Sequence, residues 1–121
     1  MAGGSCRCGP FSIEVVPKGI LKPLILKLIS ERHMHGFEIM EQIFERTGGF
    51  WRPGPAAIYP ALAWLEKNNY IRQTSRGPKS ERARNEYEIT PKGTKALQEY
   101  LKSSGNLIFY MKKFDSIYRN F

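Results

Sequence analysis

The stretch between residues 51 and 88 constrains the fold most, because an amphipathic segment runs directly into two short strand-like segments. Three apolar residues recur at offsets of 0, 4 and 7 in the first segment: Ile58, Leu62 and Leu65. This spacing predicts one buried face of a helix from about residue 55 to about residue 69. Residues 70–74 and 84–89 then read as strands around a turn at 76–80 that contains Gly and Pro. We therefore expect a helix followed at once by a polar hairpin.

Two more amphipathic helices are expected before this stretch. The first covers about residues 17–32, with Pro23 near its first turn because proline lacks the N–H that a helix interior needs. Its apolar stripe comprises Leu21, Leu24, Ile25, Leu28 and Ile29. The second covers about residues 35–46 and ends at Gly48-Gly49. A residue just after the last turn of a helix often adopts a left-handed backbone conformation, which carries no Cβ penalty in glycine. The residues expected to face inward from it are Phe37, Ile39, Met40, Ile43 and Phe44.

Further helical signals follow the hairpin. Thr90-Pro91 is a typical helix start, with threonine as N-cap and proline in the first turn. The Ser-Ser-Gly-Asn run at 103–106 should bend or break this helix. A heptad-like apolar seam and its neighbours end the chain: Leu107, Tyr110, Met111, Phe114, Ile117, Tyr118 and Phe121.

Three helices followed by a hairpin predict a fold that is mainly α with a small β hairpin. We expect an α+β winged helix-turn-helix with an appended C-terminal helix, which suits a chain of 121 residues. Three parts are expected. Residues 1–16 form a flexible N-terminal arm in which a short strand across residues 11–16 is possible, residues 17–90 form the winged domain, and residues 91–121 form a C-terminal helical segment.

The charge is unevenly distributed along the chain. The net charge is +8, with +1 over residues 1–50, +3 over residues 51–90 and +4 over residues 91–121. Each Lys or Arg near a phosphate displaces a condensed counterion, so a basic excess favours a polyanionic partner. Many small proteins are mildly basic without such a partner, and the charge therefore supports nucleic-acid binding only together with the fold.

In a winged helix the third helix enters the major groove of DNA and the wing contacts the neighbouring backbone. Phosphates require cations, and base edges require polar or small side chains. The candidate DNA-binding residues are Arg52, Ala56, Ala57, Tyr59, Lys67, Arg72, Arg76, Lys79, Arg82 and Arg84. The first two turns of the third helix offer no exposed Asn, Gln or Arg. Specificity would then come from Tyr59, from Ala56 or Ala57, or from DNA shape read by the wing.

Other classes of function find less support. No apolar run of 18 residues could cross a membrane and no signal peptide is evident, so a cytoplasmic protein is expected. There is no phosphate-binding loop and no nucleophile motif, and neither an enzyme nor a cofactor is expected. Cys6, Cys8, His33 and His35 are potential metal ligands, but the spacing of the cysteines argues against a metal site. Two close thiols could instead sense oxidants, which the sequence leaves open.

Several runs of residues occur together in a specific order and spacing. They are His35-Gly36-Phe37-Glu38-Ile39, Thr47-Gly48-Gly49-Phe50-Trp51-Arg52-Pro53, Gly54-Pro55-Ala56-Ala57-Ile58-Tyr59-Pro60-Ala61-Leu62, Leu65-Glu66, Tyr70-Ile71 and Tyr87-Glu88-Ile89-Thr90-Pro91-Lys92-Gly93. The proline inside the third helix is the most distinctive feature. In these runs, residues 18–101 resemble the PadR family of transcriptional regulators.

The resemblance implies a homodimeric winged-helix repressor that binds a near-palindromic operator and releases it when an aromatic or drug-like effector binds. Such proteins dimerise through the helix after the wing, a role that falls here to residues 91–121 and their apolar seam. The seam could instead fold back on its own domain. An effector would sit at the dimer interface, with Trp51 and Trp64 as aromatic candidates, although core packing is the more ordinary role for both. The alternatives are a winged-helix protein-interaction module without operator binding, and a non-specific nucleic-acid-binding protein.

Overall fold

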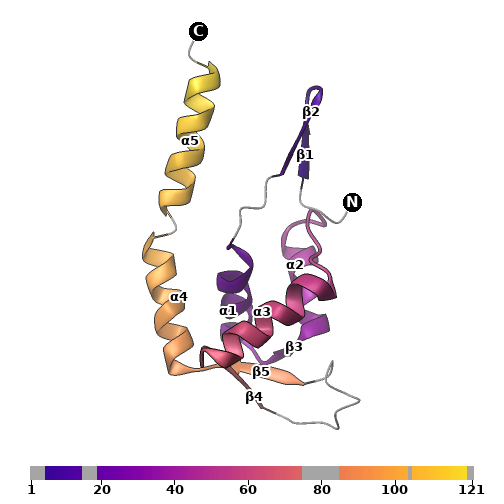
Figure 1. The fold of residues 1–121 in the computed structure, drawn as a ribbon, viewed down its shortest axis with the longest axis vertical. Coiled ribbons are helices and arrows are strands. Elements are labelled where there is room, and N and C mark those ends of the chain that lie inside the picture. Colours follow the sequence, from indigo (N-terminus) through magenta and orange to yellow (C-terminus); the bar gives the residue numbers. More distant parts are fainter. Residues whose placement is uncertain (1–4, 15–18, 75–84, 104, 120–121) are drawn as a thin grey trace.

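The computed structural model describes residues 5–14, 19–74, 85–103 and 105–119 (Figure 1). The elements in chain order are β1 (Ser5–Cys8), β2 (Phe11–Glu14), α1 (Leu21–Glu31), β3 (Met34–His35), α2 (Gly36–Arg46), α3 (Pro55–Lys67), β4 (Ile71–Gln73), β5 (Glu86–Ile89), α4 (Pro91–Ser103) and α5 (Gly105–Arg119). The described chain is thus mainly helical with small antiparallel sheets. This confirms the predicted fold class and the order of three helices and a hairpin. No helix in the described ranges is long and apolar enough to span a membrane.

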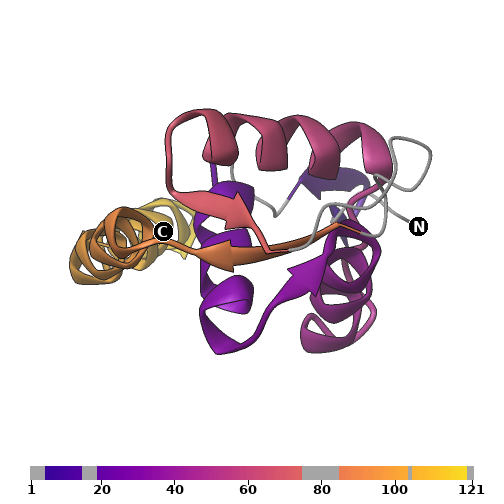
Figure 2. The same ribbon diagram turned by 90° about the horizontal axis from the view of Figure 1, so that it is seen from below.

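A three-stranded antiparallel sheet lies beneath α3, with the strand order β3-β5-β4 (Figure 2). Ile71 pairs with Ile89 and Gln73 with Tyr87, as expected for a hairpin, and Met34 pairs with Tyr87 from the other side. Strand β3 was not predicted, because two residues are too few to show an alternating pattern. The predicted turn of the hairpin lies outside the described residues.

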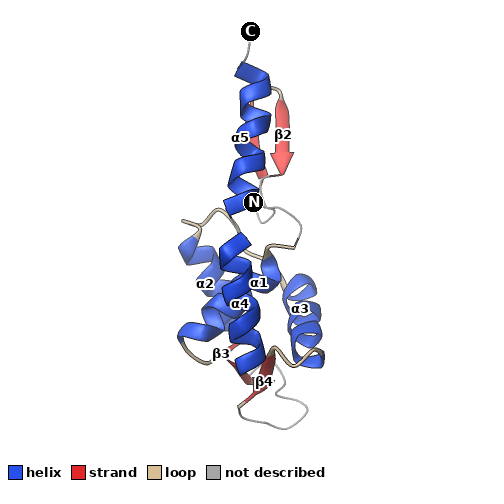
Figure 3. Ribbon diagram, turned by 90° about the vertical axis from the view of Figure 1, so that its left-hand side faces the viewer, coloured by secondary structure: helices blue, strands red, loops and turns tan. Residues whose placement is uncertain are grey.

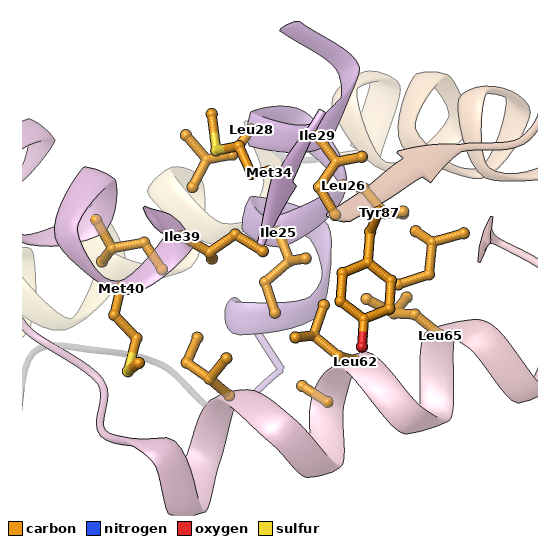
Figure 4. Packing of buried hydrophobic residues seen from close by; sticks show 14 of the residues in the cluster. Ile25, Leu26, Leu28, Ile29, Met34, Ile39, Met40, Leu62, Leu65 and Tyr87 are labelled. Carbon is orange, nitrogen blue, oxygen red and sulfur yellow. The ribbon is translucent and has the colours of Figure 1, made fainter. Parts of the chain in front are cut away.

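The core is formed where α1, α2 and α3 meet the sheet (Figure 4). Helix α1 contacts α2, α3, α4 and β5, and so lies at the centre of the domain. The largest fully buried side chains are Ile25, Leu28, Ile29, Met34, Ile39, Ile43, Ile58, Leu62, Leu65 and Ile71. Burial of each such side chain stabilises the fold by roughly 1.5–3 kcal/mol. The three-residue line predicted for α3 is therefore confirmed.

The prediction for α2 was wrong at two positions. Phe37 is 54% exposed and Phe44 is 38% exposed, whereas Ile39, Met40 and Ile43 are buried. The helix has more apolar residues than one face can bury. The buried line includes Gly36 instead of Phe37, and the guanidinium of an arginine, not the core, lies over the Phe44 ring.

The turn after α2 is held by one threonine. The Thr47 hydroxyl donates to the Ile43 carbonyl at 2.8 Å and accepts from the Trp51 N–H at 3.0 Å. Gly48 and Gly49 follow with φ of 66° and 81°, the left-handed region that glycine adopts at no steric cost. The expected helix end at these glycines is confirmed, and the turn leads the chain directly into α3.

The start of α4 is fixed against the end of α3. The Thr90 hydroxyl accepts from the Gly93 N–H at 3.0 Å and donates to the Asn69 carbonyl at 2.6 Å, which confirms Thr90 as the N-cap. A Cβ on Gly93 would lie 2.1 Å from the Tyr70 carbonyl oxygen and 2.8 Å from Ile89 Cγ1. Only glycine permits this close approach, so α4 leaves the sheet in a defined direction.

Helix α5 and the β1–β2 hairpin project from the same end of the domain (Figures 1 and 3). Helix α4 ends at Ser103 and α5 begins at Gly105, and no described residue of α5 is buried. The predicted bend or break at 103–106 includes residue 104, which lies outside the described residues. In the N-terminal segment, β2 lies within the possible strand at residues 11–16, whereas β1 was not predicted. The two strands pair in antiparallel register, Cys6 with Ile13 and Cys8 with Phe11.

The close approach at Gly93 leads to a stability prediction. Gly93→Ala should lower the free energy of unfolding by roughly 1–3 kcal/mol, because backbone or strand atoms must move to admit the methyl group. The measurement is urea denaturation followed by circular dichroism. Gly105→Ala is the matched control, since a Cβ there meets nothing within 4 Å, and it should not destabilise the protein. Equal stability of both variants and the parent would contradict the packing described.

Candidate nucleic-acid interface

The outward face of α3 is built from small residues. Ala56, Ala57, Pro60 and Ala63 are exposed, while the buried line of the same helix anchors it to the core. Pro55 occupies the first helical position and Gly54 is the N-cap without a side-chain cap bond. The positive end of the helix dipole therefore stays open at this end. A face without long side chains can approach another surface closely.

Tyr59 is held differently from its neighbours on α3. Its ring is half-buried against the core, and a Cβ on Gly36 would lie 2.8 Å from its Cε1 atom. Gly36 thus lets α2 and α3 come together over this ring. Tyr59 was expected on the groove-facing side, and its packing was not predicted, because nothing in the spacing links it to a glycine 23 positions earlier.

The His-Gly-Phe-Glu run has a local structural explanation. His35 Nδ1 accepts from the Glu38 N–H at 3.3 Å, and Glu38 Oε1 accepts from the His35 N–H at 3.3 Å. This capping box starts α2 and presents Gly36 to α3. His35 therefore has a structural role, as predicted. Among the described residues no group of three or more His, Cys, Asp or Glu could hold a metal ion.

Two of the predicted DNA-binding cations are paired with carboxylates. Arg52 pairs with Glu41 of α2, and Arg72 pairs with Glu88 across the sheet. The Arg52 and Arg72 side chains are 47% and 65% exposed. Exposed ion pairs contribute only about 0–1 kcal/mol, so either guanidinium can exchange its carboxylate for a phosphate. Lys67 is exposed in the last turn of α3.

Glu31 of α1 and Glu38 of α2 are paired with arginines as well. Arg32 donates to Glu38 at 2.8 Å, and this bond holds the pKa of Glu38 below its usual value. A hydrogen bond from Arg46 likewise lowers the pKa of Glu31. The acidic face of α2 that the sequence indicates is therefore partly compensated in the folded chain. The remaining predicted wing cations lie outside the described residues: Arg76, Lys79, Arg82 and Arg84.

A cation–aromatic stack joins α1, α3 and α4, and sequence analysis missed it. The Trp64 and Tyr70 rings stack at 5.8 Å between centroids. Lys22 Nζ lies 4.5 Å from the Trp64 centroid and Lys92 Nζ lies 4.8 Å from the Tyr70 centroid. The four residues come from four separate segments, so no local spacing could indicate the stack.

The two tryptophans differ in their surroundings. Trp51 is half-buried against the core, which agrees with the packing role expected for it. Trp64 is 45% exposed, so core packing is the wrong interpretation of this residue. Its indole instead lies at the surface between the end of α3 and the start of α4.

The exposed face of α3 and the adjacent hairpin define a winged-helix protein. The model of the transcriptional regulator PadR-like family matches residues 25–99. The chain belongs to this family. Its members are transcriptional regulators and not enzymes, which confirms the prediction of a non-enzymatic protein.

Individual relatives agree with the family match. The chain is 32% identical over 81 residues to the transcriptional regulator YqjI of Escherichia coli, covering 67% of this chain and 37% of YqjI. It is 32% identical over 84 residues to the negative transcriptional regulator PadR of Bacillus subtilis, covering 68% of this chain and 45% of PadR. The chain therefore matches less than half the length of these two relatives.

Solved structures confirm the winged-helix fold. A transcriptional regulator from Clostridium thermocellum superimposes with a TM-score of 0.71 at 30% identity, covering 80% of this chain and 94% of that one. Bacillus subtilis PadR, solved in complex with operator DNA, superimposes with a TM-score of 0.56 at 31% identity, covering 71% of this chain and 48% of that one.

The contact between Gly36 and Tyr59 can be tested by a double-mutant cycle. Gly36→Ala should destabilise the protein by about 1–3 kcal/mol, because the added methyl group meets the ring. Tyr59→Ala removes the ring, so the two losses should be less than additive by at least about 0.5 kcal/mol. Urea denaturation of the parent, both single variants and the double variant measures this coupling. Additive losses would mean that the ring and the glycine are independent.

Proposed function

We propose that this chain is a DNA-binding transcriptional regulator, acting as a homodimeric repressor on a near-palindromic operator. The observation that carries the proposal is the small-residue face of α3, held outward by a buried apolar line beside the β4–β5 hairpin. The likeness to Bacillus subtilis PadR, a negative regulator solved with operator DNA, supports it.

In the proposed complex α3 lies in the major groove. Ala56, Ala57 and Ala63 allow the helix backbone to come close to base edges, and apolar contact with thymine methyl groups is the chemistry they offer. The open N-terminus of α3 faces a phosphate. Few side chains of α3 can donate or accept at base edges, so the wing must read groove shape for much of the specificity.

Cations secure the register of this complex on the DNA backbone. Arg52 and Arg72 exchange Glu41 and Glu88 for phosphate oxygens, and Lys67 contacts phosphate from the far end of α3. The wing residues Arg76, Lys79, Arg82 and Arg84 complete the contacts. The half-buried Tyr59 contributes chiefly by holding α3 at its angle to α2, and its hydroxyl is a further candidate for base contact.

The dimer of this proposal forms through α5. Its seam is exposed in the single chain: Leu107 is 38%, Met111 55%, Phe114 58% and Tyr118 76% exposed. So large an apolar face on a helix without buried residues is typical of an interface. Phe121 belongs to the predicted seam and lies outside the described residues. Exposure of the seam supports pairing between chains over the alternative of folding back on the same domain.

An aromatic effector that releases the DNA is the last part of the proposal. The resemblance to PadR regulators and the exposed Trp64 support it. Lys22 covers one face of the indole, and an aromatic acid that displaces this side chain would stack on Trp64 and pair with the Lys22 ammonium. The cation–aromatic stack connects that position to Lys92 at the start of α4, and through α4 to the dimer helix.

DNA binding is tested by fluorescence anisotropy with the duplex just upstream of the gene and a scrambled duplex, between 50 and 200 mM salt. The upstream duplex should bind at least about 10³-fold more tightly, and affinity for both should fall steeply with salt. Arg76→Ala and Lys79→Ala should each weaken both duplexes equally and reduce the salt slope by about one.

Lys102→Ala is the matched control for these variants, because it removes the same charge from the last turn of α4. This end of α4 lies far from β4 and β5 (Figure 1). Equal affinity for the two duplexes would rule out a sequence-specific repressor and leave a non-specific binder. Absence of binding at low salt would leave the protein-interaction module.

The dimer is tested separately by light scattering. Phe114→Asp places a charge in the seam and should convert the dimer into a monomer, because an unpaired buried carboxylate is costly. Phe114→Leu keeps the seam apolar and should remain dimeric. A dimeric Phe114→Asp variant would show that the chains associate through another surface.

A further inference from the structure

Two side chains of α2 hold Arg52 at the junction between α2 and α3. Arg52 Nη2 donates to the Glu41 carboxylate, and the guanidinium carbon lies 5.8 Å from the centroid of the Phe44 ring. Neither partner belongs to the core, since Phe44 is 38% exposed and the Glu41 side chain is 34% exposed. One surface arginine thus has an anionic partner and an aromatic partner at the same time.

The backbone on both sides of Arg52 is fixed as well. The Trp51 N–H donates to the Thr47 hydroxyl at 3.0 Å, and the same hydroxyl oxygen lies 3.2 Å from the Trp51 carbonyl oxygen. On the other side Pro53 is buried, and its ring restricts φ. The Arg52 side chain therefore leaves the backbone from a defined point, just before Gly54, the N-cap of α3.

The Phe44 ring is anchored to the turn that follows α2. The Gly49 N–H donates to the Phe44 carbonyl at 2.7 Å. A Cβ on Gly49 would lie 3.5 Å from Cζ of the ring, so the ring rests against the backbone of this left-handed residue. The ring is therefore a fixed support for the arginine, although the core does not cover it.

The two partners of Arg52 differ in what they leave free for DNA. A carboxylate and a phosphate both accept N–H bonds from a guanidinium, so Glu41 competes with DNA for the same donors. An aromatic ring attracts the cation through its π electrons and takes no N–H donor. The ring can therefore keep the guanidinium in place while its donors exchange Glu41 for a phosphate.

We propose that Phe44 is a positioning residue for the DNA contact of Arg52 and that Glu41 limits the strength of this contact. Because the ring orders the long side chain in the free protein, Arg52 loses less rotamer freedom when it binds a phosphate. Glu41 acts in the opposite sense, since DNA must first displace its carboxylate. The inference rests on the proposed regulator function and assigns roles within it to two residues of α2.

The test compares Phe44→Leu with Glu41→Gln by fluorescence anisotropy on the upstream duplex. Phe44→Leu should weaken binding about two- to fivefold, the effect of one exposed cation–π contact. Glu41→Gln should strengthen binding by about two- to fivefold, because the competing charge is gone. It should also steepen the salt dependence, since no carboxylate is left to take up a cation. A purely structural role of both residues would weaken binding in both variants.

Both effects must act through the arginine. Arg52→Ala should reduce the salt slope by about one. In this background Phe44→Leu and Glu41→Gln should leave the affinity unchanged, because the group on which they act is absent. Phe37→Leu is the matched control, since Phe37 is also an exposed aromatic residue of α2 and no cation of the described ranges lies over its ring. It should bind like the parent chain.

The contrary results are distinguishable. Parental affinity of Phe44→Leu, or an equal loss with and without Arg52, overturns the positioning role. Equal or weaker binding of Glu41→Gln overturns the limiting role, and parental binding of Arg52→Ala overturns both roles while the regulator function stands. A parent chain that does not bind the upstream duplex at low salt overturns this inference together with the proposed function. If Phe44→Leu does not fold, the sign of the Glu41→Gln effect and its dependence on Arg52 decide.

Discussion

The packing of α3 on α1 is the interaction on which the rest of the structure depends. Ile58, Leu62 and Leu65 are almost fully buried, so the rotation of α3 about its axis is fixed and its alanines must face outward. Two glycines then allow neighbours to approach this helix at close range. Gly36 accommodates the Tyr59 ring of α3, and Gly93 accommodates the carbonyl of Tyr70, which follows α3, so α2 is positioned from α3 and α4 from the segment after it. The candidate interface is thus a consequence of core packing.

Patterns within one segment were sufficient to predict much of this fold. The buried line of α3 and the Thr90 cap follow from periodicity and capping chemistry, and both are confirmed. The wrong assignments concern choices between surfaces. Helix α2 has too many apolar residues for one face, and Ile39, Met40 and Ile43 are buried while Phe37 and Phe44 stay exposed.

Most of the features that the sequence did not predict combine distant segments. Strand β3 forms because it pairs with β5. The cation–aromatic stack brings together four residues from separate parts of the chain: Lys22, Trp64, Tyr70 and Lys92. The ion pairs of Arg52 and Arg72 belong to the same class. Charge counting treated these arginines as free for DNA, whereas in the folded chain a phosphate must compete with a carboxylate for each of them.

The central claim is that the small-residue face of α3 is the surface that meets DNA. The most direct measurement is the change in backbone amide ¹⁵N–¹H shifts when the upstream duplex is added to the ¹⁵N-labelled protein. The account predicts the largest changes at Ala56, Ala57 and Ala63 and in the β4–β5 hairpin, with small changes in the exposed turns of α2. Changes confined to α5 or to α2, with the α3 amides unaffected, would contradict it.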